Sequence, residues 1–434
     1  MKQLAINGGK KVRTIPFPAY VTVGEKEKQA IARVIDSGVL SRFLGAWHED
    51  FYGGPEVKAF ENEWAKYFGV KHAVAVNSAT SGIYAAVGAA GINPGDEVIV
   101  SPYSMSASAV APLIYGGIPV FADIETDYFC LSPASIEARI TPLTRAIIVV
   151  DIFGQPYDAD IINAIAKRHK LILIEDCAQA PGAKYKRRFA GTLADIGIFS
   201  LNYHKHIHTG EGGMVVTNDD RLAERVRLIR NHAEAVLSDK PSDTLVNMVG
   251  FNYRMTEIEA AIGRVQLKKL NRLLKSRLEN IAYLKKKLFS LPCLEPAKVR
   301  PQTQPVYYVL TLKYRKRTSG VPRDRFVEAV AAELAPITLR ETEGVKIGKG
   351  YTRPLYLLPL FQKRIAFGKN GYPWMKPIYS GHVSYNQGIC PVAERMYEDE
   401  LITLGIFQSP LIRKDLNDVI AAFQKVWEYR SELL

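Results

Sequence analysis

The sequence predicts an α/β protein in two parts: a large domain with a mainly parallel sheet between helices, and a smaller C-terminal α+β domain. Strand-like apolar runs alternate with helical segments from residue 72 to residue 174. These runs are apolar on both faces, as in a parallel sheet that helices cover on both sides. A long amphipathic segment, residues 255–289, then leads into the second domain. We therefore assign residues 1–255 to the large domain and residues 256–434 to the small one.

Two helices and a loop are predicted before the sheet. Residues 24–37 have a helical pattern, and residues 42–55 are aromatic and glycine-rich without a regular period, as in a loop. Pro55 suits the first turn of the next helix, because proline lacks the backbone N–H that this turn leaves unpaired. Four apolar residues share one face of that helix: Val57, Phe60, Trp64 and Phe68.

The alternating region supplies the sheet and its crossover helices. The expected strands are residues 72–76, 97–100, 119–122, 145–151 and 171–174, and the expected helices are residues 80–90, 105–114, 133–139 and 158–169. After the segment 255–289, the run Val306–Leu310 predicts a strand of the C-terminal domain. Ligands of such an open sheet collect beyond the carboxyl ends of its strands.

The composition is that of an ordinary globular protein. Of the 434 residues, 47% are apolar and 23% are charged. The four cysteines lack the spacing of a disulfide framework or a zinc site, which favours a reducing cytoplasm. The first apolar run is too short for a signal peptide, and no segment has the roughly 18 apolar residues of a membrane span. We expect a soluble, cytoplasmic protein.

A formal net charge of +13 leaves nucleic acid, a membrane surface or small anions open as partners. The densest basic group lies within residues 255–289, whose apolar residues recur at steps of three and four. We therefore place this group on the solvated face of a helix and expect neither nucleic acid nor a membrane as a partner. The group comprises Lys268, Lys269, Arg272, Lys275, Arg277, Lys285, Lys286 and Lys287.

Three candidate sites fall at the ends of strands. Asn77–Gly82 is small and hydroxylic, so its hydroxyls and the following helix N-terminus could hold a phosphate, although ordinary helix capping is the alternative. Asp176 ends an apolar strand, where a carboxylate pairs with a protonated heterocycle nitrogen or acts as a cap. In the third stretch Ser200 lies near a strand end, and Lys205 lies beyond it.

Residues 199–213 place Lys205 before a glycine-rich turn and an apolar run. An isolated lysine is most often a solvated surface charge. Three histidines alternate with it and leave a zinc-binding face open as an alternative: His204, His206 and His208. Together the three stretches offer a turn that can bind a phosphate, a carboxylate that can pair with a ring nitrogen, a further hydroxyl for the phosphate in Ser200, and the amine of Lys205. Pyridoxal 5′-phosphate (PLP) requires these groups.

Motifs along most of the chain resemble the PLP-dependent sugar aminotransferases of fold type I, the DegT/StrS family. The motifs are Gly54–Val57, Asn77–Ser81, Asn93–Val100, Ile174–Ala180, Lys205–Gly213, Gly250–Met255 and Cys390–Arg395. Several motifs in the family's order are more specific than any one of them. The resemblance implies the PLP fold type I architecture, in which the first domain binds the cofactor.

The resemblance also implies the two catalytic residues. Lys205 corresponds to the lysine that binds the PLP aldehyde covalently, and Asp176 corresponds to the acid that pairs with the ring nitrogen. Related dehydratases carry histidine in place of this lysine. Four residues separate the family's lysine from the first glycine of the turn, a spacing that selects Lys205 and excludes His204 and His206.

The same resemblance implies further PLP-binding residues: Ala79, Thr80, Met105, Gln179, Ser200, Asn202 and Asn252. In the family, the asparagine matching Asn252 reaches the phosphate in a neighbouring subunit, which implies a homodimer with shared active sites. Met105 stands where an aromatic residue usually covers the ring, so either Met105 or Tyr103 has that role. No metal is expected.

The function implied is transfer of an amino group from glutamate or glutamine to a keto-sugar, nucleotide-linked by preference, or to a keto-cyclitol. This chemistry belongs to amino-sugar, surface polysaccharide or aminoglycoside-type biosynthesis. The alternatives are a PLP-dependent sugar dehydratase, which Lys205 disfavours, and a non-catalytic amine-sensing regulator. Residues 42–52 resemble an insertion that borders the acceptor site, or else a surface loop.

Overall fold

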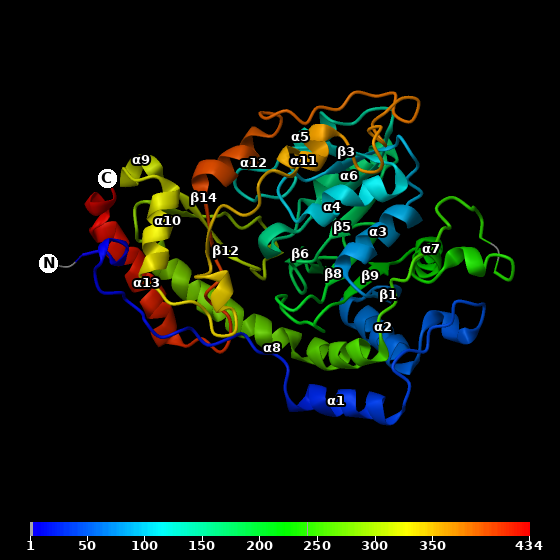
Figure 1. Ribbon diagram of the computed structural model, residues 1–434, viewed down its shortest axis with the longest axis horizontal. Helices are drawn as coiled ribbons and strands as arrows, with labels where there is room; N and C mark the ends of the chain where they lie inside the picture. The colour runs from blue at the N-terminus through cyan, green and yellow to red at the C-terminus, as the bar shows by residue number, and fades with distance from the viewer. Residues whose placement is uncertain (1–2, 241) are drawn as a thin grey trace.

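The computed structural model describes residues 3–240 and 242–434. A seven-stranded sheet with the order β1-β9-β8-β5-β4-β2-β3 forms the centre of the larger part, and helices lie around it (Figure 1). The strands are β1 (His72–Val76), β2 (Glu97–Val100), β3 (Ile118–Phe121), β4 (Thr144–Val150), β5 (Ile172–Asp176), β8 (Ile196–Ser200) and β9 (Gly213–Thr217). Only the two pairings of β9 are antiparallel among these described strands, so the predicted mainly parallel sheet is confirmed.

Both faces of the sheet are buried, because alternate residues of a strand enter different cores. Ala73 and Ala75 of β1 pack in one core with α2 (Pro55–Phe68), whereas Val74 and Val76 pack in another with α3 (Ala79–Ala89). The predicted apolar face of α2 is fully in the first core: Val57, Phe60, Trp64 and Phe68. Helices on both faces explain why the strands are apolar throughout.

The other predicted helices of this part are confirmed with small shifts of their ends. They are α1 (Glu25–Asp36), α5 (Pro133–Glu137), α6 (Ala159–His169) and α8 (Glu257–Leu288). Of the predicted helix 105–114 only α4 (Ser106–Val110) is α-helical, and α7 (Asp220–Arg230) was not predicted. Residues 105–114 form two pieces, because a 3₁₀ turn over Ala111–Tyr115 follows α4. Pro112 lies inside this turn and cannot donate the backbone hydrogen bond that would continue an α-helix.

A second, four-stranded antiparallel sheet has the order β10-β12-β14-β13. Its strands and helices are β10 (Leu294–Pro296), β12 (Leu310–Tyr314), β13 (Ile347–Lys349), β14 (Leu401–Leu404), α9 (Lys316–Ser319), α10 (Arg323–Ala332) and α13 (Arg413–Glu428). A third, small sheet consists of β6 (Lys184–Tyr185), β7 (Arg188–Phe189) and β11 (Thr303–Gln304). The remaining α-helices of the described residues are α11 (Pro359–Lys363) and α12 (Pro391–Arg395). This mixed second part agrees with the predicted α+β class.

Two segments pack away from their neighbours in sequence. Leu4 and Phe17, near the N-terminus, lie in the core of the second sheet, and both chain ends are on that side of the molecule (Figure 1). Conversely, Tyr356 and Tyr385 pack in the core of the large sheet. The division into residues 1–255 and 256–434 stays a prediction, and these segments cross it.

The predicted strand Val306–Leu310 is wrong, because β12 begins only at Leu310. The N–H groups of Val306 and Tyr308 instead donate to the carbonyls of Gly154 (2.9 Å) and Phe153 (2.8 Å). Tyr307 between them has a φ of +50°, which interrupts extended backbone. This segment therefore connects the two parts across the carboxyl edge of the large sheet.

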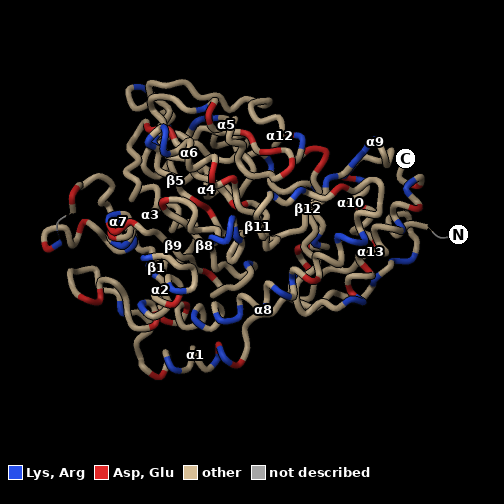
Figure 2. Tube along the Cα trace, turned by 180° about the vertical axis from the view of Figure 1, so that it is seen from behind, with Lys and Arg blue, Asp and Glu red and all other residues tan. Residues whose placement is uncertain are grey.

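Helix α8 carries most of its basic group on the outside, as predicted, and Figure 2 shows Lys and Arg along it. Arg277 is the exception, since only 2% of it is exposed. Its Nη1 donates to the Tyr307 carbonyl at 2.8 Å, and its guanidinium lies 5.2 Å from the Phe407 ring. The placement of Arg277 on the solvated face was wrong because burial of a guanidinium depends on partners distant in sequence.

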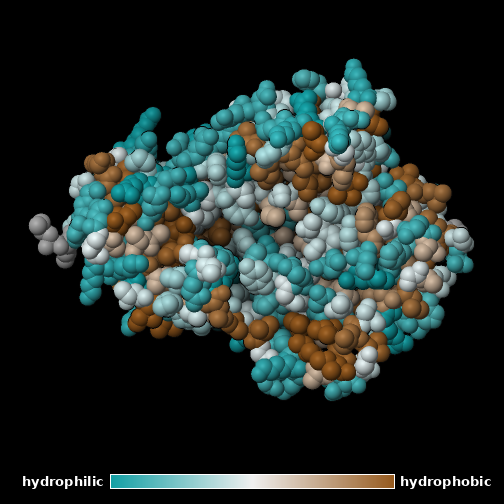
Figure 3. Space-filling view, viewed as in Figure 1, coloured by the Kyte–Doolittle hydropathy of each residue, from teal (hydrophilic) through white to brown (hydrophobic). Residues whose placement is uncertain are grey.

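Helix α1 lies along α8 and shares a small apolar cluster with it. Ala30, Val34 and Ala261 are buried there, while Ile35 stays 57% exposed. Figure 3 shows apolar side chains on the surface over these two helices. Within the described parts of the chain, no helix is long and apolar enough to span a bilayer.

Candidate active site

A cavity of about 240 Å³ lies where strands β4, β5 and β8 end. Val150, Asp176 and Ser200 are the last residues of these strands, and all three line the cavity. It therefore occupies the carboxyl edge at which an open parallel sheet binds ligands. The predicted cofactor-binding residues gather in its wall, except Asn252: Ala79, Thr80, Met105, Asp176, Gln179, Ser200, Asn202 and Lys205.

Asp176 is buried, with 4% of its surface exposed. The Ser108 hydroxyl donates to Oδ2 at 2.7 Å, and the Ala178 N–H donates to Oδ1 at 3.1 Å. Burial raises the pKa of Asp176, while these hydrogen bonds and the charge of Lys205 oppose the rise. A nearby cation would stabilise its ionised form, and a protonated ring nitrogen is such a cation.

The Lys205 ammonium lies 4.4 Å from the centre of the Tyr308 ring. Burial lowers the pKa of Lys205 from 10.5 to about 8, although the charge of Asp176 raises it. The loop that carries Lys205 is braced, because Lys205 N–H donates to the Asn202 carbonyl (2.9 Å) and Asn202 Nδ2 donates to Glu211 (2.8 Å). The structure thus presents an amine that loses its proton easily, on a constrained loop.

The N-terminus of α3 forms another wall of the cavity. Ser78 caps this helix by accepting from the Ser81 N–H at 3.0 Å, and Ala79 and Thr80 form its first turn. A side chain at Gly213 would place its Cβ 2.6 Å from the Ser78 carbonyl carbon, so glycine is required for β9 to pack against this turn. The unpaired N–H groups of a first helical turn are suited to a phosphate.

Gln179 and the candidate ring-facing residues complete the wall. The Gln179 side chain accepts from the Phe153 N–H (2.8 Å) and donates to the Tyr351 hydroxyl (2.9 Å). Met105 lines the cavity and is 60% exposed, whereas Tyr103 is fully buried. The Tyr103 hydroxyl accepts from the Tyr351 N–H at 2.9 Å, which places it behind the cavity wall.

Sequence reasoning missed three residues of this site: Ser108, Tyr308 and Tyr351. Ser108 had a signal that it shares with Ser106, since these two are the only hydroxyls in the predicted helix 105–114. Tyr308 was assigned to a strand that the structure does not contain. Tyr351 had no local signal, because its contact with Gln179 joins positions 172 residues apart.

The three histidines face different surroundings. His204 lines the cavity, whereas His206 is buried with Nε2 3.3 Å from the Val306 carbonyl, and His208 Nδ1 accepts from Gly210 N–H at 3.4 Å. Burial and the charge of Lys205 lower the pKa of His204 to about 4, so it is neutral at pH 7. Across residues 3–240 and 242–434, no group of three or more His, Cys, Asp or Glu side chains suited to a metal ion is found.

Asn252 and the loop of residues 42–52 lie outside this cavity. Asn252 is exposed, and its Oδ1 accepts from Arg254 at 2.8 Å. The loop packs near α7: Asn231 Nδ2 donates to the Leu44 carbonyl (2.8 Å), and the Tyr52 hydroxyl donates to Glu224 (3.2 Å). In the described chain, no residue of the loop lines the cavity.

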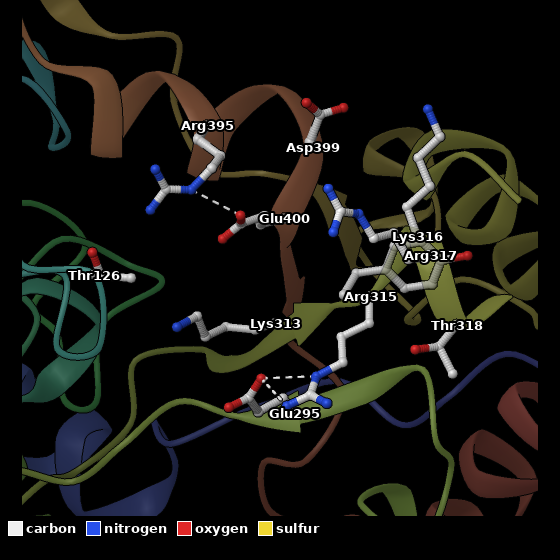
Figure 4. A pocket seen from close by; sticks show the side chains of 11 residues that line it. Thr126, Glu295, Lys313, Arg315, Lys316, Arg317, Thr318, Arg395, Asp399 and Glu400 are labelled. Carbon is white, nitrogen blue, oxygen red and sulfur yellow. Dashed lines mark hydrogen bonds and ion pairs between the residues drawn. The ribbon is translucent and has the colours of Figure 1, made fainter. Parts of the chain in front are cut away.

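A larger cavity, about 770 Å³, lies beside β10, β12 and α9 (Figure 4). Two ion pairs form within its wall: Arg315 is 2.7 Å from Glu295, and Arg395 is 2.8 Å from Glu400. Lys205 and Asp176 line the smaller cavity and not this one. We therefore assign the chemistry to the smaller cavity.

The residues of the smaller cavity fit PLP. A helix N-terminus and hydroxyls suit its phosphate, a buried carboxylate suits its ring nitrogen, and a half-buried lysine with a lowered pKa suits its aldehyde. The close approach of β9 at Gly213 keeps the N-terminus of α3 in position.

Comparison with known proteins agrees with this site. The family model of the DegT/DnrJ/EryC1/StrS aminotransferase family matches residues 25–384. The L-glutamine:2-deoxy-scyllo-inosose aminotransferase of Streptoalloteichus tenebrarius is 33% identical over 99% of both chains. The spore coat polysaccharide biosynthesis protein SpsC of Bacillus subtilis is 33% identical over 81% of this chain and 86% of its own.

Solved structures show the same fold. DesV of S. venezuelae, solved with a ketimine intermediate, superposes with a TM-score of 0.75 at 30% identity, covering 93% of this chain and 94% of its own. DesI, solved with its TDP-sugar product, gives a TM-score of 0.79 at 27% identity over 99% and 97% of the two chains. Fold, cavity and similarity over most of the chain agree, and the protein belongs to the DegT/DnrJ/EryC1/StrS family of PLP-dependent aminotransferases.

Proposed function

We propose that this aminotransferase carries an amino group from glutamate or glutamine to the ketone carbon of a nucleotide-linked keto-sugar or a keto-cyclitol. The observation that carries the proposal is the joining of Lys205, Asp176 and the α3 N-terminus in one cavity. The acceptor class is supported by relatives named for scyllo-inosose amination, by one named GDP-perosamine synthase, and by DesI with its TDP-sugar product.

In this proposal Lys205 and Asp176 are the catalytic residues. Bound PLP supplies an aldehyde that takes up the amino group and a ring that withdraws electrons from the reacting carbon. Asp176 holds a proton at the ring nitrogen, because its buried carboxylate needs a cationic partner. The Lys205 amine, with a pKa of about 8, accepts a proton from the donor's Cα and delivers it to the adjoining cofactor carbon, C4′.

The other residues hold the cofactor. Ala79, Thr80 and Ser200 bind the phosphate, and Gln179 lies beside the ring hydroxyl. Met105 covers the ring face in preference to Tyr103, since Met105 lines the cavity and Tyr103 lies behind its wall. Asn202 supports the lysine loop through Glu211.

We further propose a homodimer with shared active sites. Asn252 is exposed and outside the cavity of its own subunit, as expected if it serves the partner's phosphate. Loop 42–52 would then border the acceptor site of the partner. The four cysteines are free and buried, which supports a reducing cytoplasm as the location, and neither nucleic acid nor a membrane is part of the proposal.

Spectroscopy of the purified protein tests the proposal. After incubation with PLP it should show a visible absorbance that glutamate or glutamine bleaches, and the amine-loaded form should aminate a keto-sugar or an inosose in a single turnover. Lack of PLP binding would contradict the proposal. A product that loses oxygen without gaining nitrogen would identify a dehydratase instead.

A further inference from the structure

Tyr351 lines the active-site cavity, although it follows β13 of the second sheet in the sequence. Its backbone N–H donates to the Tyr103 hydroxyl at 2.9 Å. Its ring packs edge-on against the Phe153 ring, with 5.1 Å between the ring centres. Backbone and ring are therefore both held against the large sheet, which restricts rotation of the side chain.

The hydrogen bonds around Gln179 run in a fixed direction. A backbone N–H can only donate, so the group that the Phe153 N–H meets at 2.8 Å is the amide oxygen of Gln179. The NH₂ group of Gln179 therefore faces the Tyr351 hydroxyl and donates to it at 2.9 Å. A hydroxyl that accepts a bond still has its own hydrogen to donate. Within residues 3–240 and 242–434, no protein group is found that accepts this hydrogen.

The Tyr351 hydroxyl keeps its proton at neutral pH. Burial raises the pKa of Tyr351, the neighbouring Tyr308 and Asp176 raise it further, and the bond from Gln179 opposes the rise. Both neighbours line the same cavity as Tyr351, so the hydroxyl end of its side chain lies at the cavity. The hydroxyl thus offers a hydrogen-bond donor to the proposed cofactor site.

The order of the strands indicates which part of PLP this donor meets. Strand β5, which ends in Asp176, has β8 and then β9 on one side and β4 on the other. The N-terminus of α3 packs against Gly213 of β9, whereas Gln179 bonds Phe153, just beyond the end of β4. On the PLP ring, the phosphate arm and the hydroxyl are attached on opposite sides of the aldehyde carbon. A ring with its phosphate at α3 therefore directs its hydroxyl toward Gln179 and Tyr351.

We propose that Tyr351 donates a hydrogen bond to the ring oxygen of bound PLP, so that the second part of the chain supplies a group to the cofactor site. An ionised ring oxygen accepts a stronger bond than a neutral one. The nitrogen through which Lys205 binds PLP lies next to this oxygen and shares its proton with it. When that proton leaves, the charged oxygen needs another donor, so Tyr351 lowers the pH at which it leaves. This inference rests on the proposed function.

A pH titration of the visible absorbance of the PLP-loaded enzyme, without substrate, tests the contact. Tyr351→Phe keeps the ring and its packing but removes the hydroxyl. The midpoint of the titration should rise by roughly one pH unit or more, because a hydrogen bond to a charged oxygen is lost.

A second measurement compares two cofactors on cofactor-stripped protein: PLP and an analogue in which hydrogen replaces the ring hydroxyl. The wild type should bind PLP more tightly than the analogue. Tyr351→Phe should lower this preference roughly tenfold, because its effect requires the ring oxygen. A loss of stability alone would weaken binding of both cofactors equally and leave the preference unchanged.

Tyr385→Phe is the matched control. Tyr385 is also buried, and its hydroxyl donates to the Pro119 carbonyl at 2.8 Å, away from the active-site cavity. Its variant loses a buried hydroxyl as well, so it controls for general damage. It should keep the wild-type midpoint and cofactor preference.

The outcomes separate this inference from the proposed function. If Tyr351→Phe leaves both the midpoint and the cofactor preference unchanged, the contact with the ring oxygen is overturned while the aminotransferase proposal stands. An unchanged midpoint together with a raised KM for the keto acceptor also overturns it and assigns the hydroxyl to the substrate. Wild-type protein that takes up no PLP overturns both proposals.

Discussion

The floor and the mouth of the active-site cavity are built differently. The floor, comprising Asp176, Ser108 and Gln179, lies at the edge of the large sheet and is nearly inaccessible to solvent. The mouth, where the exposed residues Met105 and Glu211 line the cavity, lies outside the helices and strands, and 60% of Met105 is exposed. Buried polar groups are costly to disturb, whereas exposed ion pairs contribute little to stability. The floor is therefore suited to fixed chemistry, and the mouth to the choice of substrate.

Lys205→Ala, beside the floor, should have the largest effect. Removing the amine eliminates the covalent attachment of PLP and the proton-transfer group, and activity should fall roughly a thousandfold or more. Borohydride reduction followed by peptide mapping should no longer find cofactor at residue 205. Lys186→Ala, an exposed lysine paired with Asp160, is the control and should retain the adduct. An adduct that persists in Lys205→Ala would contradict the assignment.

Asp176→Asn keeps the shape of the floor but removes its charge. We expect activity to fall roughly a hundredfold, because an amide cannot hold the ring nitrogen protonated. The absorbance spectrum of the bound cofactor should change with it. Near-normal turnover with an unchanged spectrum would show that another residue pairs with the ring.

The pH dependence of PLP capture tests the burial of Lys205. Only the neutral amine attacks an aldehyde, and burial lowers the pKa of Lys205 from 10.5 to about 8. The capture rate of cofactor-stripped protein should therefore rise with pH and level off above about pH 8, whereas a solvated lysine would keep rising to about 10.5. Stopped-flow absorbance measured between pH 8 and pH 10.5 distinguishes a buried lysine from a solvated one.

Ser108→Ala removes one hydrogen bond from the floor. Asp176 loses a donor at 2.7 Å, and a hydrogen bond to a charged group contributes about 1.5–3 kcal/mol, so activity should fall roughly tenfold or more. The fraction of enzyme holding PLP at limiting cofactor should also fall. Ser106→Ala, on the same helix but not bonded to Asp176, should match the wild type.

Glu343→Gln, in an ion pair outside the cavity wall, should have the smallest effect on stability. Its free energy of unfolding in urea should differ from wild type by less than about 1 kcal/mol, because the pair is on the surface. A larger loss would mean that this exposed ion pair is structural, and the contrast with the buried floor would fail.

Local patterns in the sequence predicted much of the fold. The helix over Pro55–Phe68 was predictable because apolar residues that recur every 3.6 positions mark its buried face. The strands at the centre of the large sheet were predictable because an apolar run between turns marks a strand that is buried on both faces. The strand at 306–310 was not, since Tyr307 adopts a positive φ that its type does not favour, with its neighbours bonded to Phe153 and Gly154. Arg277 was misplaced for the same reason: its partners lie elsewhere in the chain.

The sequence by itself led to the two residues that we propose as catalytic, because Lys205 and Asp176 belong to motifs whose spacing is specific. Only the tertiary structure decided how they are tuned: the Ser108 bond to Asp176, the Tyr308 ring over Lys205, and Tyr351 behind Gln179. Motif spacing is local along the chain, whereas burial, pKa and donor access arise from contacts between segments that only folding brings together.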